Sequence, residues 1–226
     1  MKVGVFGTGI VGQTIAGKLL SLGHSVMIGT RDPAATLARA EKDMLGFPPF
    51  RDWHAQHPEA KLGTMAETAA FGELCFNVLN GQGAIAALES AGADKLAGKV
   101  LVDVTNPLDF SKGFPPSLFV SNTDSLGEQI QRALPRTRVV KTLNTVNAFV
   151  MVDPKLVAGE HTMFVAGNDA DAKATVSGLL REGFGWSDLV DLGDITGARA
   201  TEGYLLLWVR LFGSLKNGQF NIRVVR

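Results

Sequence analysis

Three glycines near the amino terminus have the spacing of a site that binds phosphate groups. They belong to a G-x-G-x-x-G stretch, which consists of Gly7, Thr8, Gly9, Ile10, Val11 and Gly12. In such a stretch the first glycine permits a tight turn, the second lets the backbone approach a pyrophosphate, and the third allows close packing of helix and strand. The start of the following helix offers free N–H groups and a partial positive charge. The spacing predicts a dinucleotide site, and a glycine-rich turn without a ligand is the alternative.

The elements on either side of the glycines must position them. Residues 2–6 form a short apolar run typical of a strand, apolar residues at helical spacing follow at positions 15–20, and residues 25–29 begin a second strand. A glycine triplet between a strand and a helix, within a unit of about thirty residues, is far more specific than a bare triplet. The arrangement therefore favours the dinucleotide interpretation.

The end of the second predicted strand indicates which dinucleotide binds. An NAD site usually carries an acidic residue there, which accepts a hydrogen bond from the ribose. This chain has Thr30 and Arg31 instead, a hydroxyl and a guanidinium that suit a 2′-phosphate. Asp32 could be the acidic residue of an NAD site, but it falls late, and Asp32-Pro33 is typical of a helix cap and first turn. We predict NADP(H), with NAD and a merely solvated Arg31 as the alternatives.

Composition restricts the class of protein. The chain has 226 residues, is 46% hydrophobic and carries 22 basic and 22 acidic residues, so it has a large core and no net charge. Zero net charge argues against nucleic acid or an anionic membrane as the main partner. The single cysteine, Cys75, lies in an apolar run, where a buried thiol is expected and no intrachain disulfide can form. We expect no signal peptide, no membrane span and a cytoplasmic location.

The remaining pattern predicts alternating strands and helices. Strands are expected at residues 74–79, 100–104, 138–143, 162–166 and 189–192, with a short one near Leu62, and helices at residues 34–44, 84–90, 125–134 and 196–215. Capping signals at Thr64, Ser125 and Asp169 predict helix starts. This order predicts an α/β fold, a Rossmann-type doubly wound and mostly parallel sheet with a small helical C-terminal part. We expect a NADP-binding domain at 1–150 and an extension at 151–226.

Two segments outside the predicted sheet bear on function. Residues 109–121 are rich in Pro, Ser and Phe and are predicted to form a loop over the site. The last helix is apolar all round its centre, residues 205–209, so it should lie deep in the core or against a second subunit. We therefore expect a homodimer.

His54 and His57 resemble half a metal site, but no cysteine or acidic cluster accompanies them. They are expected to lie in a loop or short helix, so no metal site is predicted.

No acid–base or nucleophilic motif is present in the sequence. It contains no G-x-S-x-G, no H-E-x-x-H and no Tyr-x-x-x-Lys, and its four histidines fall in predicted loops or at element edges. Oxidation of an alcohol, or reduction of a ketone, moves a proton with the hydride and needs a general acid or base. A hydride transfer between two rings needs only alignment, with the reacting carbons about 3–3.5 Å apart and water excluded. We therefore predict no catalytic side chain.

Four motifs together resemble those of a known family. They are Gly7 to Gly12, Gly29 to Arg31, Lys141 to Val146, and the late set formed by Asp191 to Gly193, Ala198, Arg199 and Glu202. Over essentially the whole chain the sequence resembles the NADPH-dependent coenzyme F-420 reductases. It is also similar to the NADPH-binding domains of metalloreductases, which have a stretch like Val102 to Asn106.

The resemblance implies that a hydride passes directly between NADPH and the deazaflavin ring of F-420. It implies that the pyrophosphate is held by Thr8, Gly9, Ile10 and Val11, and the 2′-phosphate by Thr30 and Arg31. Leu79 and Gly83 would line the cofactor groove. The Ala148 backbone would meet the nicotinamide carboxamide, with Asn144 and Val146 beside the ring. The segment 193–199 would approach the deazaflavin. The chain departs from the family where Ala35 replaces a lysine, Asn80 a proline and Asn144 a histidine.

Several alternatives remain open at this level. The acceptor could be F-420, FMN, FAD or another ring, and the direction of the reaction is not fixed. A reductase of a small imine or keto acid would need a proton donor that the sequence does not reveal, and a non-catalytic NADP sensor would lack the second ring pocket. Asn144 could instead cap a turn, and Arg199 with Glu202 could be a helix-surface pair.

Overall fold

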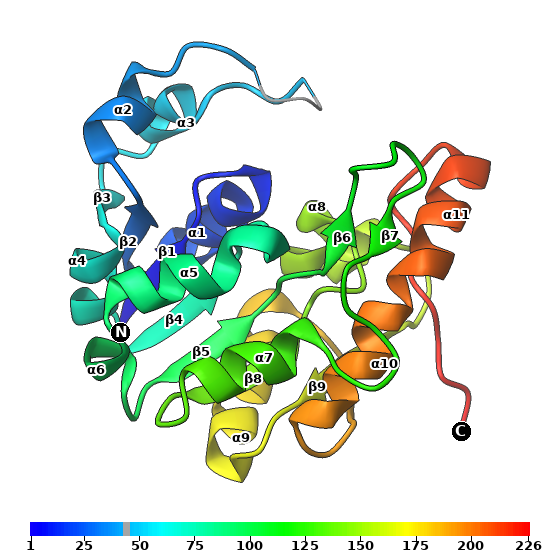
Figure 1. The fold of residues 1–226 in the computed structure, drawn as a ribbon. Coiled ribbons are helices and arrows are strands. Elements are labelled where there is room, and N and C mark those ends of the chain that lie inside the picture. The colour runs from blue at the N-terminus through cyan, green and yellow to red at the C-terminus, as the bar shows by residue number, and fades with distance from the viewer. Residues whose placement is uncertain (43–45) are drawn as a thin grey trace.

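An eight-stranded sheet forms the centre of the protein in the computed structural model, which describes residues 1–42 and 46–226 (Figure 1). In spatial order its strands are β10 (Asp188–Asp191), β9 (Thr162–Ala166), β8 (Arg138–Thr142), β5 (Val100–Asp103), β4 (Leu74–Asn77), β1 (Lys2–Phe6), β2 (Ser25–Thr30) and β3 (Lys61–Thr64). Neighbouring strands are parallel except β8 and β9, which pair antiparallel. The predicted α/β fold, a doubly wound and mostly parallel sheet with a helical C-terminal part, is confirmed.

Helices cover both faces of this sheet (Figure 1). They are α1 (Ile10–Ser21), α2 (Pro33–Ala38), α3 (Phe50–Gln56), α4 (Met65–Phe71), α5 (Gly81–Ala91), α6 (Ala93–Leu96), α7 (Leu126–Ala133), α8 (Ala148–Val152), α9 (Ala170–Gly178), α10 (Ala198–Gly203) and α11 (Leu205–Leu215). A π-helical turn, Leu179–Phe184, follows α9, and 3₁₀ turns lie at Pro154–Leu156 and Ile195–Gly197.

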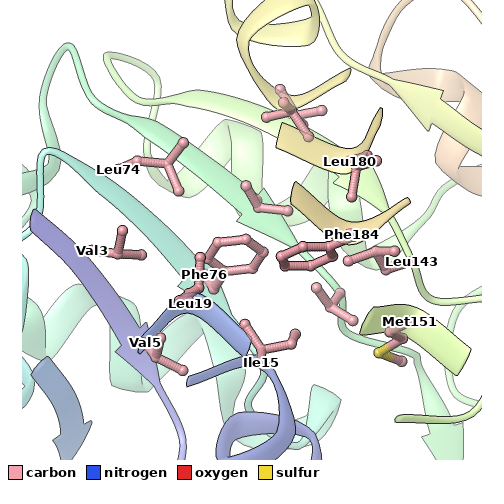
Figure 2. Close-up of a cluster of buried hydrophobic side chains, with 14 of the residues drawn as sticks. Val3, Val5, Ile15, Leu19, Leu74, Phe76, Leu143, Met151, Leu180 and Phe184 are labelled. Carbon is pink, nitrogen blue, oxygen red and sulfur yellow. The ribbon is translucent and has the colours of Figure 1, made fainter. Parts of the chain in front are cut away.

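Alternation along the strands divides the core into two clusters of apolar side chains. Val3 and Val5 of β1 belong to the cluster that packs against α1, α8 and α9, whereas Phe6 belongs to the cluster under α4, α5 and α7. In the first cluster the rings of Phe76 and Phe184 stack, with centroids 6.4 Å apart, as Figure 2 shows. Both faces of the sheet are thus buried, as a parallel sheet requires.

The predicted helix starts are confirmed by their caps. The Asp32 carboxylate accepts from the Ala35 N–H at 2.9 Å, so Asp32 caps α2. Thr64 forms a reciprocal capping box with Glu67 at the start of α4. Side-chain caps also begin α7 at Ser125 and α9 at Asp169. Each cap satisfies a backbone N–H that has no partner within its helix.

Two local predictions are wrong. The helix predicted at 34–44 ends at Ala38, and the end of that prediction lies outside the described residues. Residues 39–42 are all exposed, so no buried face would stabilise a further turn. The segment 109–121 is not simply a loop, because β6 (Leu108–Asp109) and β7 (Ser117–Leu118) pair as a small antiparallel hairpin.

The C-terminal part departs from the prediction in its details. The helix predicted at 196–215 begins as a 3₁₀ turn and is divided into α10 and α11 at Tyr204. Its apolar side chains do not all enter the core, since Leu206 and Leu207 are 52% and 53% exposed. Among the described residues, no helix has the length and apolarity that crossing a bilayer would require. Strands β9 and β10 extend the main sheet, and the division of the chain near residue 150 stays a prediction.

Candidate functional site

The glycine turn between β1 and α1 has a separate structural reason for each glycine. Gly7 has a φ of +127°, which disfavours any residue with a side chain. A Cβ at Gly12 would lie 2.1 Å from the Gly7 carbonyl oxygen, so only glycine allows α1 to approach the turn. A Cβ at Gly9 would have no atom within 4 Å. The position where a pyrophosphate would approach the backbone is therefore open, and the turn fits the phosphates of a dinucleotide.

A cavity of about 480 Å³ begins at this turn. Its lining residues are Gly7, Thr8, Gly9, Gly29, Thr30, Arg31, Asp32, Ala35, Thr36, Arg39, Met65, Val78, Leu79 and Asn80. They come from the end of β2 and from the segments that follow β1, β2, β3 and β4, at the carboxyl ends of these parallel strands. The strand order reverses beside β1, and ligands of doubly wound sheets bind at such a point. The structure thus brings Thr8 and Gly9, two of the residues predicted to hold the pyrophosphate, into one cavity with Thr30 and Arg31, predicted to hold the 2′-phosphate.

A second cavity, of about 670 Å³, lies beside the first and shares Arg31, Met65, Leu79 and Asn80 with it. Gly83 and further residues of α4 and α5 complete its lining, which is mainly apolar. A flat apolar group such as an adenine would suit this surface, with Arg31 at its edge. Leu79 and Gly83 therefore lie where the resemblance puts a cofactor groove, although their role in binding stays a prediction.

The residues predicted beside the nicotinamide lie apart from both cavities. Asn144 donates from Nδ2 to Oδ1 of Asn106 at 2.9 Å, and Asn106 returns a hydrogen bond to the Asn144 carbonyl at 3.0 Å. Asn144 thus bridges the ends of β5 and β8, a role different from the turn cap considered above. Its Oδ1 is buried and has no partner among the described residues. Val146 and Ala148 are buried, Ala148 being the first residue of α8.

Ile10, Val11 and Gly12 lie in the first turn of α1, which Gly9 precedes as the N-cap. None of these three residues lines either cavity. What they offer to a phosphate is their backbone N–H groups, which have no partner within the helix.

A hydrogen bond ties the end of β2 to α2, since the Thr30 and Thr36 hydroxyls are 2.8 Å apart. Sequence reasoning did not identify Thr36 and Arg39 as site residues, because they come to line the cavity only when α2 folds back beside β2.

A buried charge cluster lies behind the strand ends, and sequence reasoning missed it. The Nζ of Lys141 is 2.9 Å from Oδ2 of Asp103 and 2.8 Å from Oε1 of Glu202, and it donates to the Thr105 carbonyl at 2.5 Å. The Lys141 and Asp103 side chains are fully buried. Burial alone would lower the pKa of Lys141, but the two carboxylates outweigh it and raise that pKa above its ordinary value. A lysine within the apolar run of β8 was the available signal.

Glu202 and Arg199 do not form the helix-surface pair that was one alternative. Glu202 faces inward, where its carboxylate accepts from the backbone N–H groups of Leu126 and Gly127 at 2.8 and 2.9 Å, at the start of α7. Arg199 instead binds both carboxylate oxygens of Glu128, and these hydrogen bonds lower the pKa of Glu128. The late motif thus joins α10 to α7. Whether residues 193–199 approach a second ring stays a prediction.

The four histidines lie away from the two cavities, and each has a ring nitrogen near another polar group of the chain. His161 is engaged through both nitrogens, with Pro154 O and Asn221 Nδ2 each at 2.9 Å. His54 and His57 lie on or beside α3, where their rings contact the carbonyls of Ala60 and Trp53. Within the described ranges, no group of three or more His, Cys, Asp or Glu side chains could hold a metal ion.

Comparison with known proteins supports the assignment of the fold. The family model described as NADP oxidoreductase, coenzyme F420-dependent, matches residues 2–107. The crystal structure of a candidate F420-dependent NADP-reductase from Arthrobacter sp. FB24 is 56% identical, superposes with a TM-score of 0.96, and covers 100% of both chains. The F420-dependent NADP reductase of Methanothermobacter marburgensis is 29% identical over 223 residues, which are 96% of this chain and 94% of that protein.

A longer relative shares only part of its length with this chain. Metalloreductase STEAP3 of Rattus norvegicus is 28% identical over 202 residues, which are 89% of this chain but 36% of that protein. The fold and the glycine turn define the class, a Rossmann-type dinucleotide-binding protein. Within that class the chain belongs to the family of coenzyme F420-dependent NADP oxidoreductases. It is an NADP-dependent oxidoreductase, and its family implies NADP(H) and F420 as cofactors.

Proposed function

We propose that this protein transfers a hydride directly between NADPH and the deazaflavin ring of F420. The observation that carries the proposal is the cavity that runs from the open glycine turn to Thr30 and Arg31. One end offers backbone donors to a pyrophosphate, and the other offers a guanidinium to a 2′-phosphate. When bound, NADP(H) supplies or accepts the hydride, and the chain supplies alignment.

In this proposal each predicted residue has a binding or orienting task. The pyrophosphate is held by Thr8, Gly9, Ile10 and Val11, and the 2′-phosphate by Thr30 and Arg31. The adenosine groove is lined by Leu79 and Gly83. Ala148 binds the carboxamide through its backbone, and Asn144 and Val146 lie beside the ring. The Asn144–Asn106 pair supports this task, since two reciprocal hydrogen bonds fix the ends of β5 and β8 relative to one another. Fixed strand ends favour alignment of two flat rings.

Ring-to-ring transfer also agrees with the acid–base groups that the structure describes. Each of the four histidine rings contacts another polar group of the chain, and the buried Lys141 is held between two carboxylates. A reductase of a small imine or keto acid would need a proton donor at the substrate. A non-catalytic NADP sensor would bind NADPH without passing on its hydride.

A spectrophotometric assay separates these functions. The purified protein is mixed with NADPH and, in turn, F420, FMN, FAD or a small cyclic imine, and the loss of NADPH absorbance is followed. Rapid oxidation with F420 as acceptor, exceeding that with the imine, is the expected result. Oxidation only with the imine would replace the proposal by an imine reductase. Tight NADPH binding with no oxidation by any acceptor would make the protein a sensor.

We also propose that the protein is a cytoplasmic homodimer that associates through α11. Leu206, Leu207, Phe212 and Leu215 of this helix are between 40% and 56% exposed, which is unusual for large apolar side chains on one short helix. The second subunit was one of two locations predicted for this helix, and the exposed face supports it. Light scattering tests the proposal, because Leu207→Glu should convert the dimer to a monomer. The proposed cytoplasmic location is supported by Cys75, a free and buried cysteine, because a free thiol suits a reducing compartment.

A further inference from the structure

A second arginine lines the cavity that contains the residues proposed to hold the 2′-phosphate. Arg39 lines this cavity together with Thr30, Arg31 and Ala35. It is the exposed residue directly after α2, where the backbone leaves the helical conformation with φ −68° and ψ 122°. Residues four apart share one face of a helix, so Arg39 follows Ala35 by about one turn on the same side of α2. Its long side chain can therefore occupy space that the Ala35 methyl leaves open.

The charge of this cavity depends on Arg39. Among the described residues, the charged ones that line this cavity are Arg31, Asp32 and Arg39, which together give a formal charge of +1. The Asp32 carboxylate is engaged as the cap of α2 through the Ala35 N–H. In the parts of the chain that the structure describes, neither arginine forms an ion pair. Without Arg39 the lining would be formally neutral, although a phosphate monoester carries between about one and a half and two negative charges at neutral pH.

A hydroxyl donor lies in the same cavity. The oxygens of Thr30 and Thr36 are 2.8 Å apart, so one hydroxyl donates to the other. The hydroxyl that accepts this bond keeps its own hydrogen free for another acceptor. Arg31, Arg39 and this hydroxyl thus line one cavity with donors that suit phosphate oxygens.

We propose that Arg39 is the second cationic contact for the 2′-phosphate and determines the preference for NADPH over NADH. The inference rests on the NADP(H) site of the proposed function and adds a specificity-determining residue to it. The chain supplies two guanidinium groups from either end of α2, so a phosphate between them is held from two directions.

Calorimetric titration tests the role of Arg39 without any turnover. Wild type, Arg39→Ala and the control Arg51→Ala are titrated with NADPH, NADH, adenosine 2′,5′-bisphosphate and adenosine 5′-monophosphate. Arg51 is an exposed arginine of α3 that lines neither cavity. Loss of one charge-assisted contact should weaken NADPH and the bisphosphate roughly 10- to 100-fold. NADH and the monophosphate should change less than about twofold, and Arg51→Ala should match wild type.

A rescue variant makes the inference specific. In Arg39→Ala, the additional substitution Ala35→Lys should restore most of the affinity for NADPH, because it returns a cation to the same face of α2. Unchanged NADPH affinity in Arg39→Ala, or an equal loss for NADPH and NADH, would overturn the role of Arg39 alone. If wild type fails to bind NADPH, this inference and the proposed function both fall. If Arg39→Ala weakens NADPH but no ring acceptor is reduced, Arg39 stands and the proposed function does not.

Discussion

Replacing Lys141 with methionine removes the ammonium group that lies between the Asp103 and Glu202 carboxylates. Both carboxylates stay buried, since the side chains of Asp103 and Glu202 are 0% and 2% exposed. Breaking a buried ion pair by removing one partner typically costs about 3–5 kcal/mol of unfolding free energy. We expect the lower part of this range, because Asp103 keeps a hydrogen bond from Asn77 at 2.9 Å and Glu202 keeps two backbone N–H donors.

Urea unfolding followed by tryptophan fluorescence measures this loss. Trp186 is 1% exposed, so unfolding transfers a buried indole to water. The expected result for Lys141→Met is a lower midpoint with an unchanged slope, which indicates a change in stability and not in the surface exposed on unfolding. Because a typical domain has about 5–15 kcal/mol of stability, the variant should still fold.

Two further variants test the cause of the loss. The control Lys95→Met removes an exposed lysine of α6 and should cost less than about 0.5 kcal/mol. Adding Glu202→Gln to Lys141→Met removes one unpaired charge and should recover about 1 kcal/mol or more. A loss no larger than that of Lys95→Met would refute the reasoning.

Four further outcomes are expected. Gly9→Val should abolish NADPH binding in calorimetry and leave the melting temperature unchanged, since the valine side chain would enter space that is open in the folded chain. An unaltered affinity for NADPH would show that the pyrophosphate does not bind at this turn. Arg31→Ala should weaken NADPH about 10- to 100-fold and NADH far less, and equal losses would contradict the 2′-phosphate assignment. The hydrogen bond from Arg132 lowers the pKa of Asp124 from 3.8 to about 2. Asp124→Asn should therefore lower the unfolding free energy by up to about 1 kcal/mol above about pH 4, and the difference should vanish as pH falls through about 2; a difference independent of pH would count against this pair. Burial raises the pKa of Cys75 to about 11, so a thiol reagent should label the native protein far more slowly than the unfolded one, and equal labelling rates would show that Cys75 is accessible.

The sequence by itself determined the local features of this protein. The glycine turn is readable because a positive φ at Gly7 and the contact at Gly12 are requirements of a few consecutive residues. Helix starts are readable for the same reason, since the cap at Asp32 and the capping box at Thr64 join residues three apart. The order of strands and helices then limits the fold to a doubly wound sheet, whose strand ends must carry the site.

Only the tertiary structure decided which distant side chains meet. Lys141 could have been a surface residue, but the sheet places it beside Asp103, 38 residues earlier, and α10 brings Glu202 to its other side. Arg39 lines the cavity because α2 lies beside the end of β2, a contact made by the Thr30 and Thr36 hydroxyls. The packing of the whole chain decides which side chains are buried, and buried charges must be paired. The spacing of neighbouring residues in the sequence does not reveal these distant contacts.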